Sequence, residues 1–166
     1  MIGVVLGLGF QLWPEVKEPW QFLAFVFVYM DIVDYWIDYG PALKKFPPKR
    51  EIDVLLDVAI MFSLFLYIYA TQLNIFYFFC AFILIRILDY FWLFSSKHEY
   101  NPVGTDRVFV DTWLEFDLIE IVLTAGIALL AFFSTLSPLA LLLGYIAFRI
   151  IVRILASRRY KRIHFA

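Results

Sequence analysis

The sequence predicts an all-α fold, a polytopic transmembrane helical bundle, and three observations carry this prediction. Of the 166 residues, 63% are hydrophobic and 20% are aromatic, whereas a soluble globular domain is about 45–50% apolar. About five stretches approach the roughly 20 apolar residues that cross a hydrocarbon core. Basic residues gather in alternate links between these stretches. Because a core of this size cannot hide so much apolar surface from water, lipid has to solvate most of it.

The expected spans follow one another with little chain between them. They cover residues 20–39, 52–70, 73–94, 108–133 and 136–155. Gly40-Pro41 is expected to end the first span, since proline lacks a backbone donor and clashes with the preceding helical turn. The short links Thr71–Gln72 and Ser134–Thr135 predict two antiparallel helical hairpins. Residues 1–166 are therefore expected to form a single transmembrane domain.

The N-terminal segment is apolar but differs from a span and from a signal peptide. The stretch MIGVVLGLGFQLW has 13 residues, too few to cross a bilayer. It carries no basic region, and no small-residue cleavage pattern precedes Pro14. We expect residues 1–19 to be a retained interfacial segment, amphipathic or re-entrant.

Basic residues indicate how the bundle is oriented. They occur in the link after the first span, in the link after the third, and in the tail 156–166: Lys44, Lys45, Lys49, Arg50, Lys97, Arg107, Arg158, Arg159, Lys161 and Arg162. The positive-inside rule places these segments and the C-terminus inside and the N-terminus outside, in a cell membrane or an organelle inner membrane. We expect the basic inner tail to contact anionic lipid and not nucleic acid.

Charged residues within the spans are the candidate functional residues, because a charge in hydrocarbon is paired, hydrated or protonated and marks a functional site. The predicted charge network comprises Arg86, Asp89, Asp117, Glu120, Arg149 and Arg153. A second acidic face comprises Asp31, Asp34 and Asp57. Acids nearer the span ends fit a simpler interpretation, solvation by headgroups and water: Glu51, Asp53, Asp106 and Asp111.

The sequence contains few of the residues that usually bind cofactors or metal ions. With one cysteine, Cys80, and two histidines, His98 and His164, no internal disulfide forms, and we expect no cofactor and no conventional zinc, haem or iron–sulfur site. Whether the aspartates bind Mg²⁺ is left open. The D-G-x-x-A-R pattern of phosphatidyl-alcohol transferases and the D-D-x-x-D pattern of prenyl transferases are both absent. The sequence therefore favours a protein that is not an enzyme.

Three motifs resemble voltage-sensor domains. The segment FVDTWLEFD (109–117) resembles the start of their third helix, with its pattern F-x-D-x-W-N-x-F-D. ILDYFWLFSSK (87–97) is similar to the acid-bearing end of their second helix, and FRIIVRILASRRYKR (148–162) to the inner part of their arginine helix. The resemblance covers residues 52–162. It implies a charge-transfer site in which Asp89 and Asp117 hold Arg149 and Arg153.

The chain departs from the voltage-sensor pattern at several positions. Arg86 stands where an aromatic residue is expected, Leu93 where a basic residue is expected, and Leu114 in place of the asparagine. The outer part of the last span, LSPLALLLGYIAF (136–148), contains no arginine. A voltage sensor moves charges through the membrane field, and moving one charge is worth about 2.3 kcal/mol per 100 mV. A last span without arginine in its outer part is therefore expected to sense little voltage.

Three functions are compatible with these features. The first is participation in cation or proton movement through the charge network. The second is a non-catalytic structural or accessory subunit of a larger membrane complex, in which charges pair across helices to select partners. The third is a metal-dependent lipid enzyme. The expected partners are membrane lipid and either further copies of the chain or other membrane subunits.

Overall fold

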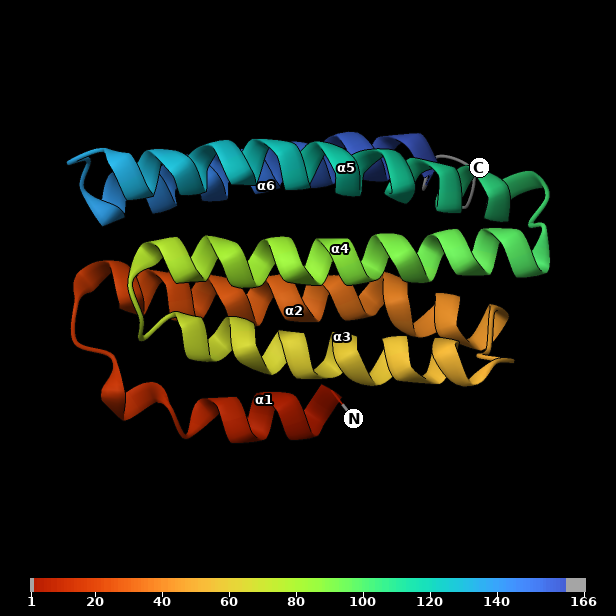
Figure 1. Ribbon diagram of the computed structural model, residues 1–166, viewed down its shortest axis with the longest axis horizontal. Coiled ribbons are helices and arrows are strands. Elements are labelled where there is room, and N and C mark those ends of the chain that lie inside the picture. Colours follow the sequence, from red (N-terminus) through yellow and green to blue (C-terminus); the bar gives the residue numbers. More distant parts are fainter. Residues whose placement is uncertain (1, 161–166) are drawn as a thin grey trace.

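The computed structural model describes residues 2–160 and folds them into six α-helices. These are α1 (Ile2–Phe10), α2 (Pro19–Lys45), α3 (Glu51–Ala70), α4 (Ile75–Tyr100), α5 (Gly104–Phe133) and α6 (Pro138–Tyr160), with a 3₁₀ turn at Trp13–Glu15. Helices α2 to α6 are long and apolar enough to cross a membrane, and they lie side by side along the longest axis of the molecule (Figure 1). The predicted all-α polytopic bundle is confirmed.

The helices close into one bundle around α4. Helix α4 packs against α3 on one side and α5 on the other, and α6 packs against α5. Helix α2 contacts both α3 and α6. The pairs α3–α4 and α5–α6 are antiparallel hairpins joined by short links (Figure 1), as the sequence predicted. The Asn74 side chain caps the start of α4 by accepting a hydrogen bond from the Phe76 N–H at 2.9 Å.

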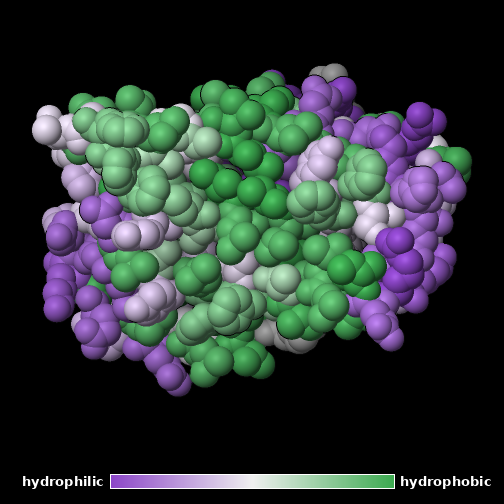
Figure 2. All heavy atoms as spheres, viewed as in Figure 1, coloured by the Kyte–Doolittle hydropathy of each residue, from purple (hydrophilic) through white to green (hydrophobic). Residues whose placement is uncertain are grey.

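One end of the bundle collects most of the basic residues, and we call it the basic end. It lies at the right in Figure 1 and contains the end of α2, the start of α3, the link between α4 and α5, and the end of α6. The other end, with residues 71–74 and 134–137, is called the opposite end. Hydrophilic residues lie at both ends of the face shown in Figure 2, and a broad apolar belt lies between them. This is the surface of a bilayer-spanning protein.

At the basic end the helices extend beyond the apolar stretches that predicted them. Helices α2, α4 and α6 end at Lys45, Tyr100 and Tyr160, and α5 begins at Gly104. A helix needs no apolar surface once it has left the hydrocarbon, so hydropathy alone does not predict these turns. Exposed ion pairs join the extra turns to neighbouring helices: Lys45–Asp106 at 2.5 Å, Lys97–Asp111 at 2.7 Å and Arg159–Glu115 at 2.5 Å. Such pairs contribute little to stability individually.

Helix α2 continues through Gly40-Pro41, where the sequence predicted an end. Proline in a helix interior costs about 3 kcal/mol. The following turn offsets this cost because it buries Ala42 and Phe46. The Phe46 ring packs on the Tyr100 ring, with 5.4 Å between their centroids. The Phe46 N–H also donates to the Ala42 carbonyl at 2.8 Å. Packing of apolar side chains thus keeps the chain helical as far as Lys45.

Helix α1 lies alongside the bundle and not across its end. It packs against α3 and runs parallel to the long axis (Figure 1). The Tyr29 hydroxyl donates to the Leu6 carbonyl at 2.7 Å. A Cβ atom at Gly9 would lie 2.5 Å from Cδ1 of Ile68, so glycine permits the close approach. Residues 2–10 therefore form a helix that packs along α3, and their place relative to the membrane stays a prediction.

Candidate functional site

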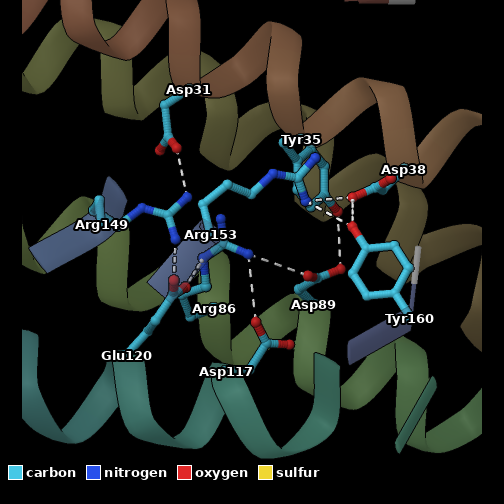
Figure 3. Close-up of polar contacts among 10 residues, drawn as sticks. All are labelled: Asp31, Tyr35, Asp38, Arg86, Asp89, Asp117, Glu120, Arg149, Arg153 and Tyr160. Carbon is cyan, nitrogen blue, oxygen red and sulfur yellow. Dashed lines mark hydrogen bonds and ion pairs between the residues drawn. The ribbon is translucent and has the colours of Figure 1, made fainter. Parts of the chain in front are cut away.

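Arg86 lies at the centre of a buried group of carboxylates (Figure 3). Its Nη1 is 3.4 Å from Asp89 Oδ2 and 3.4 Å from Asp117 Oδ1, and its Nε is 3.0 Å from Glu120 Oε2. Arg86 and Asp89 are three residues apart on α4, as are Asp117 and Glu120 on α5, so each pair shares one helix face. Three carboxylates therefore surround one guanidinium group.

Arg149 on α6 extends this group to α2. Its Nη2 is 2.5 Å from Asp31 Oδ1, and its Nη1 contacts Oε1 of Glu120. Glu120 thus bridges Arg86 and Arg149 (Figure 3). We call these six residues the core network: Asp31, Arg86, Asp89, Asp117, Glu120 and Arg149. The structure brings Asp31, which the sequence assigned to a second acidic face, into the predicted charge network.

Aromatic side chains support the core network. The Phe82 ring lies near both guanidinium groups, 5.0 Å from the Arg86 Cζ and 4.9 Å from the Arg149 Cζ, and the negative face of a ring attracts a cation. The Tyr35 hydroxyl donates to Asp89 Oδ1 at 2.9 Å. Neither aromatic residue was predicted, because their composition and spacing do not distinguish them from the many other rings of this chain.

Arg153 forms a second group one helical turn closer to the basic end. Its Nε is 2.6 Å from Asp34 Oδ2, and its Nη1 contacts Oδ2 of Asp38 and donates to the Tyr160 hydroxyl at 2.9 Å. The Tyr160 hydroxyl in turn donates to Asp38 (Figure 3). We call Asp34, Asp38, Arg153 and Tyr160 the inner group. Asp38 and Tyr160 were not predicted as site residues, although Asp38 is four residues after Asp34 and shares its helix face.

Asp57 stands apart from both groups. Its Oδ1 accepts a hydrogen bond from the Tyr39 hydroxyl at 2.6 Å, and its side chain is buried beside α2. The Tyr39 ring stacks on Tyr35, with 5.1 Å between their centroids. The predicted second acidic face is therefore divided, because Asp31 and Asp34 pair with arginines of α6 and Asp57 binds a tyrosine.

Carboxylates outnumber arginines in both groups. In the core network four carboxylates pair with two guanidinium groups, a formal charge of −2. In the inner group two carboxylates contact Arg153. An uncompensated charge inside a membrane protein costs several kcal/mol. The core network therefore requires further positive charge or protonation of carboxylates.

Two carboxylate oxygens of the core network have no hydrogen-bond partner among the described residues: Glu120 Oε2, which lies 3.0 Å from Arg86 Nε, and Asp117 Oδ2. Asp117 is fully buried, and its Oδ1 faces Arg86. Buried polar atoms almost always have such a partner. A proton on the Asp117 carboxyl would remove the mismatch, since a protonated carboxyl is neutral and costs far less to bury.

A small cavity lies on the side of the core network that faces the basic end. Its volume is about 30 Å³, and it is lined by Asp34, Asp38, Arg86, Asp89, Arg149 and Arg153, together with rings that extend toward the basic end. This volume suffices for two or three water molecules, at about 10–15 Å³ each. Residues of both the inner group and the core network thus line one cavity.

A layer of fully buried rings closes the side toward the opposite end. This aromatic layer consists of Tyr67, Phe78, Phe79, Phe82 and Tyr145. The two tyrosine hydroxyls lie 3.1 Å apart and hydrogen-bond to each other. The Tyr145 ring contacts Phe79 and Phe82, with centroids 5.3 Å and 5.2 Å away. The layer contains no charged side chain and separates the core network from the opposite end.

Within residues 2–160, no group of three or more His, Cys, Asp or Glu side chains is arranged to hold a metal ion. The carboxylates of the network converge on guanidinium groups and not on one another (Figure 3). The tail residues 161–166, including Lys161 and Arg162, lie outside the described residues.

The ion pairs differ from those that the voltage-sensor resemblance implied. Asp89 and Asp117 contact Arg86, whereas Arg149 pairs with Asp31 and Glu120. Arg86 belongs to α4 itself, one turn before Asp89, and contacts carboxylates of both α4 and α5.

The fold and the site together define a polytopic membrane helical bundle with a buried, acid-rich arginine–carboxylate network. Comparison of the sequence with protein-family models and with curated proteins, and of the structure with solved structures, gives no match in any of the three. The functional argument therefore rests on the geometry of the network itself.

Proposed function

We propose that this membrane protein takes part in proton movement, and that the core network is the site where protons bind. The excess of carboxylates carries this proposal, because four of them share two guanidinium groups in the core network. Intramembrane carboxylates paired with arginine are a usual component of proton relays. A proton neutralises a surplus carboxylate without any change in the packing around it.

The arrangement favours a proton over a metal cation. Each carboxylate of the core network contacts at least one guanidinium group. A fixed positive charge at 2.5–3.4 Å repels a second cation, but it leaves the remaining carboxylate oxygen able to accept a proton. Asp117 Oδ2 is such an oxygen.

Access to the network comes from the basic end, through the cavity lined by Asp34, Asp38 and Asp89. By the positive-inside rule this end faces the cell or organelle interior. Movement across the membrane then requires a second state in which the aromatic layer opens. The resemblance to voltage-sensor domains suggests one such state. A shift of α6 by four residues, about 6 Å, would carry Arg153 to the position of Arg149 beside Phe82.

Neutralising the network is expected to abolish proton flux. The double substitution Asp89→Asn/Glu120→Gln removes two carboxylates that contact Arg86 while preserving their size. In liposomes with an internal pH-sensitive dye and a potassium diffusion potential, the wild-type protein is expected to acidify or alkalise the lumen according to the sign of the potential. The double variant is expected to match protein-free liposomes.

The matched control is Asp106→Asn/Glu115→Gln, which neutralises two acids in exposed ion pairs of the same α5 helix. This control should retain wild-type flux. Circular dichroism and size-exclusion profiles identify variants that fail to fold. Unchanged flux in a folded Asp89→Asn/Glu120→Gln protein would contradict the proposal and favour the alternative, an accessory subunit whose ion pairs only hold helices together.

A further inference from the structure

Four buried residues of α5 lie along one face of this helix, and each has a polar atom without a hydrogen-bond partner among the described residues. The atoms are Trp113 Nε1, Asp117 Oδ2, Glu120 Oε2 and Thr124 Oγ1. The four residues are at most 7% exposed. Their spacing of four, three and four positions keeps them on one face over about 16 Å of helix. We call these residues the α5 line. Because buried polar atoms almost always have a partner, a ligand or a second state has to supply one here.

The α5 line extends from the cavity to the aromatic layer. Trp113 lines the cavity, and the next two residues of the line belong to the core network. The ion pair between Arg149 and Glu120 gives the level of Thr124. Tyr145 lies four residues before Arg149 on α6, and Thr124 lies four residues after Glu120 on α5. Since these two helices are antiparallel, both residues lie about 6 Å closer to the opposite end. Thr124 is therefore level with the aromatic layer.

The Thr124 hydroxyl differs from other buried hydroxyl groups of the bundle. Serine and threonine in a helix commonly donate to a backbone carbonyl of the preceding turn. Ser63 and Thr71 do so, each at 2.8 Å from the carbonyl oxygen three residues earlier. The two tyrosine hydroxyls of the aromatic layer bond to each other. Thr124 is fully buried and has no such bond among the described residues. A hydroxyl left without a partner costs free energy, so packing alone does not explain a threonine here.

The mixture of groups in the α5 line fits water better than an ion. The indole N–H of Trp113 only donates hydrogen bonds, whereas the two carboxylate oxygens accept them. The Thr124 hydroxyl does both. A metal cation would satisfy only the acceptors, and an anion only the donors. Neighbouring residues of the line are about 4.5–6 Å apart along the helix axis, close to the roughly 5.6 Å that one water spans with two hydrogen bonds.

We propose that Thr124 is a proton-relay residue on the path through the aromatic layer. This inference rests on the proposed function, because it names the step that follows the core network. When the layer opens, water extends along the α5 line from Glu120 to Thr124. A protonated water on one side transfers its proton to Thr124 Oγ1 while the hydroxyl proton of Thr124 passes to a water on the other side. The hydroxyl is thereby restored. In the closed structure Thr124 does not line the cavity, and its hydroxyl stays unpaired.

Replacing Thr124 with valine tests the proposal, because valine has a similar shape and a methyl group in place of the hydroxyl. In the liposome assay we expect Thr124→Val to lower proton flux by about tenfold or more. Unfolding by sodium dodecyl sulfate should give the opposite sign. The midpoint is expected to rise, because the closed bundle no longer buries an unpaired hydroxyl. Thr124→Ser keeps the hydroxyl and should keep flux near the wild-type level.

The matched control is Thr71→Val. Thr71 is also fully buried, but its hydroxyl donates to the Ile68 carbonyl. Removing this satisfied hydroxyl should lower the unfolding midpoint and leave proton flux unchanged. The two valine variants are thus expected to differ in the sign of the midpoint shift and in flux, which a general effect of losing a buried hydroxyl cannot produce.

Three results would overturn the relay while leaving the core network as the proton site. One is wild-type flux in a folded Thr124→Val protein. Another is a Thr124→Val midpoint at or below that of the wild type, which would show that the hydroxyl is already bonded in the closed bundle. The third is a flux loss in Thr124→Ser as large as in Thr124→Val, which would assign the effect to side-chain shape. A wild-type protein without flux would contradict both the relay and the proposed function.

Discussion

Replacing Arg86 with methionine is expected to lower the free energy of unfolding by about 3–5 kcal/mol, the cost of breaking a buried ion pair from one side. Arg86 is the group that Asp89, Asp117 and Glu120 share. Methionine keeps much of its volume and removes its charge, so three buried carboxylates lose their common partner. Unfolding by sodium dodecyl sulfate in mixed micelles, followed by circular dichroism, measures the effect.

Neutralising the stranded carboxylates should restore stability. In the variant Arg86→Met/Asp89→Asn/Asp117→Asn, Glu120 retains its contact with Arg149, and no unpaired charge remains next to position 86. We expect this variant to recover more than half of the loss. Arg107→Met is the control, because the Arg107 side chain is 67% exposed and lies 3.5 Å from Asp111. If Arg86→Met costs no more than this control, the core network does not stabilise the bundle.

Replacing Tyr145 with alanine is expected to open the aromatic layer. The Tyr145 ring is fully buried against Phe27, Phe78, Phe79 and Phe82. Removing a ring of this size from a core costs about 3–5 kcal/mol. The substitution also leaves a space one helical turn from Arg149, which lies four residues after Tyr145 on α6. In the liposome assay we expect a proton leak larger than the wild-type flux.

Tyr145→Phe separates the ring from its hydroxyl group. It preserves the ring contacts and removes the hydrogen bond to Tyr67, a loss of about 1–3 kcal/mol for the buried hydroxyl that remains. The leak should stay at the wild-type level. A folded Tyr145→Ala protein that does not leak would show that the aromatic layer is not what seals the core network.

The spans could be predicted from the sequence because a membrane-spanning helix needs a long apolar stretch. A bilayer requires about 20 apolar residues per span, and each of the long helices contains such a stretch. The helix ends at the basic end carry no such signal. Pro41 in α2 illustrates this, since only the burial of Ala42 and Phe46 shows that the helix continues. The orientation derived from the basic links stays a prediction.

Most of the charged residues of the site could be predicted from the sequence, but the ion pairs that they form could not. Spacing along one helix shows which residues share a face, such as Arg86 with Asp89. It does not show which neighbouring helix that face meets, because this depends on helix rotation and packing. Asp31 was therefore separated from Arg149, with which it forms an ion pair. Tyr160 was not predicted, because its role depends on its hydroxyl reaching Asp38 across the bundle.

The central claim is that the core network holds protons at neutral pH, because its carboxylates exceed its guanidinium groups by two. Infrared spectroscopy of the folded protein in lipid tests this most directly, since protonated and ionised carboxyl groups absorb at separate frequencies. We predict a protonated-carboxyl band at pH 7 in the wild-type protein that is diminished in Asp117→Asn. The absence of this band from the folded wild-type protein, or a band that this substitution leaves unchanged, would contradict the account.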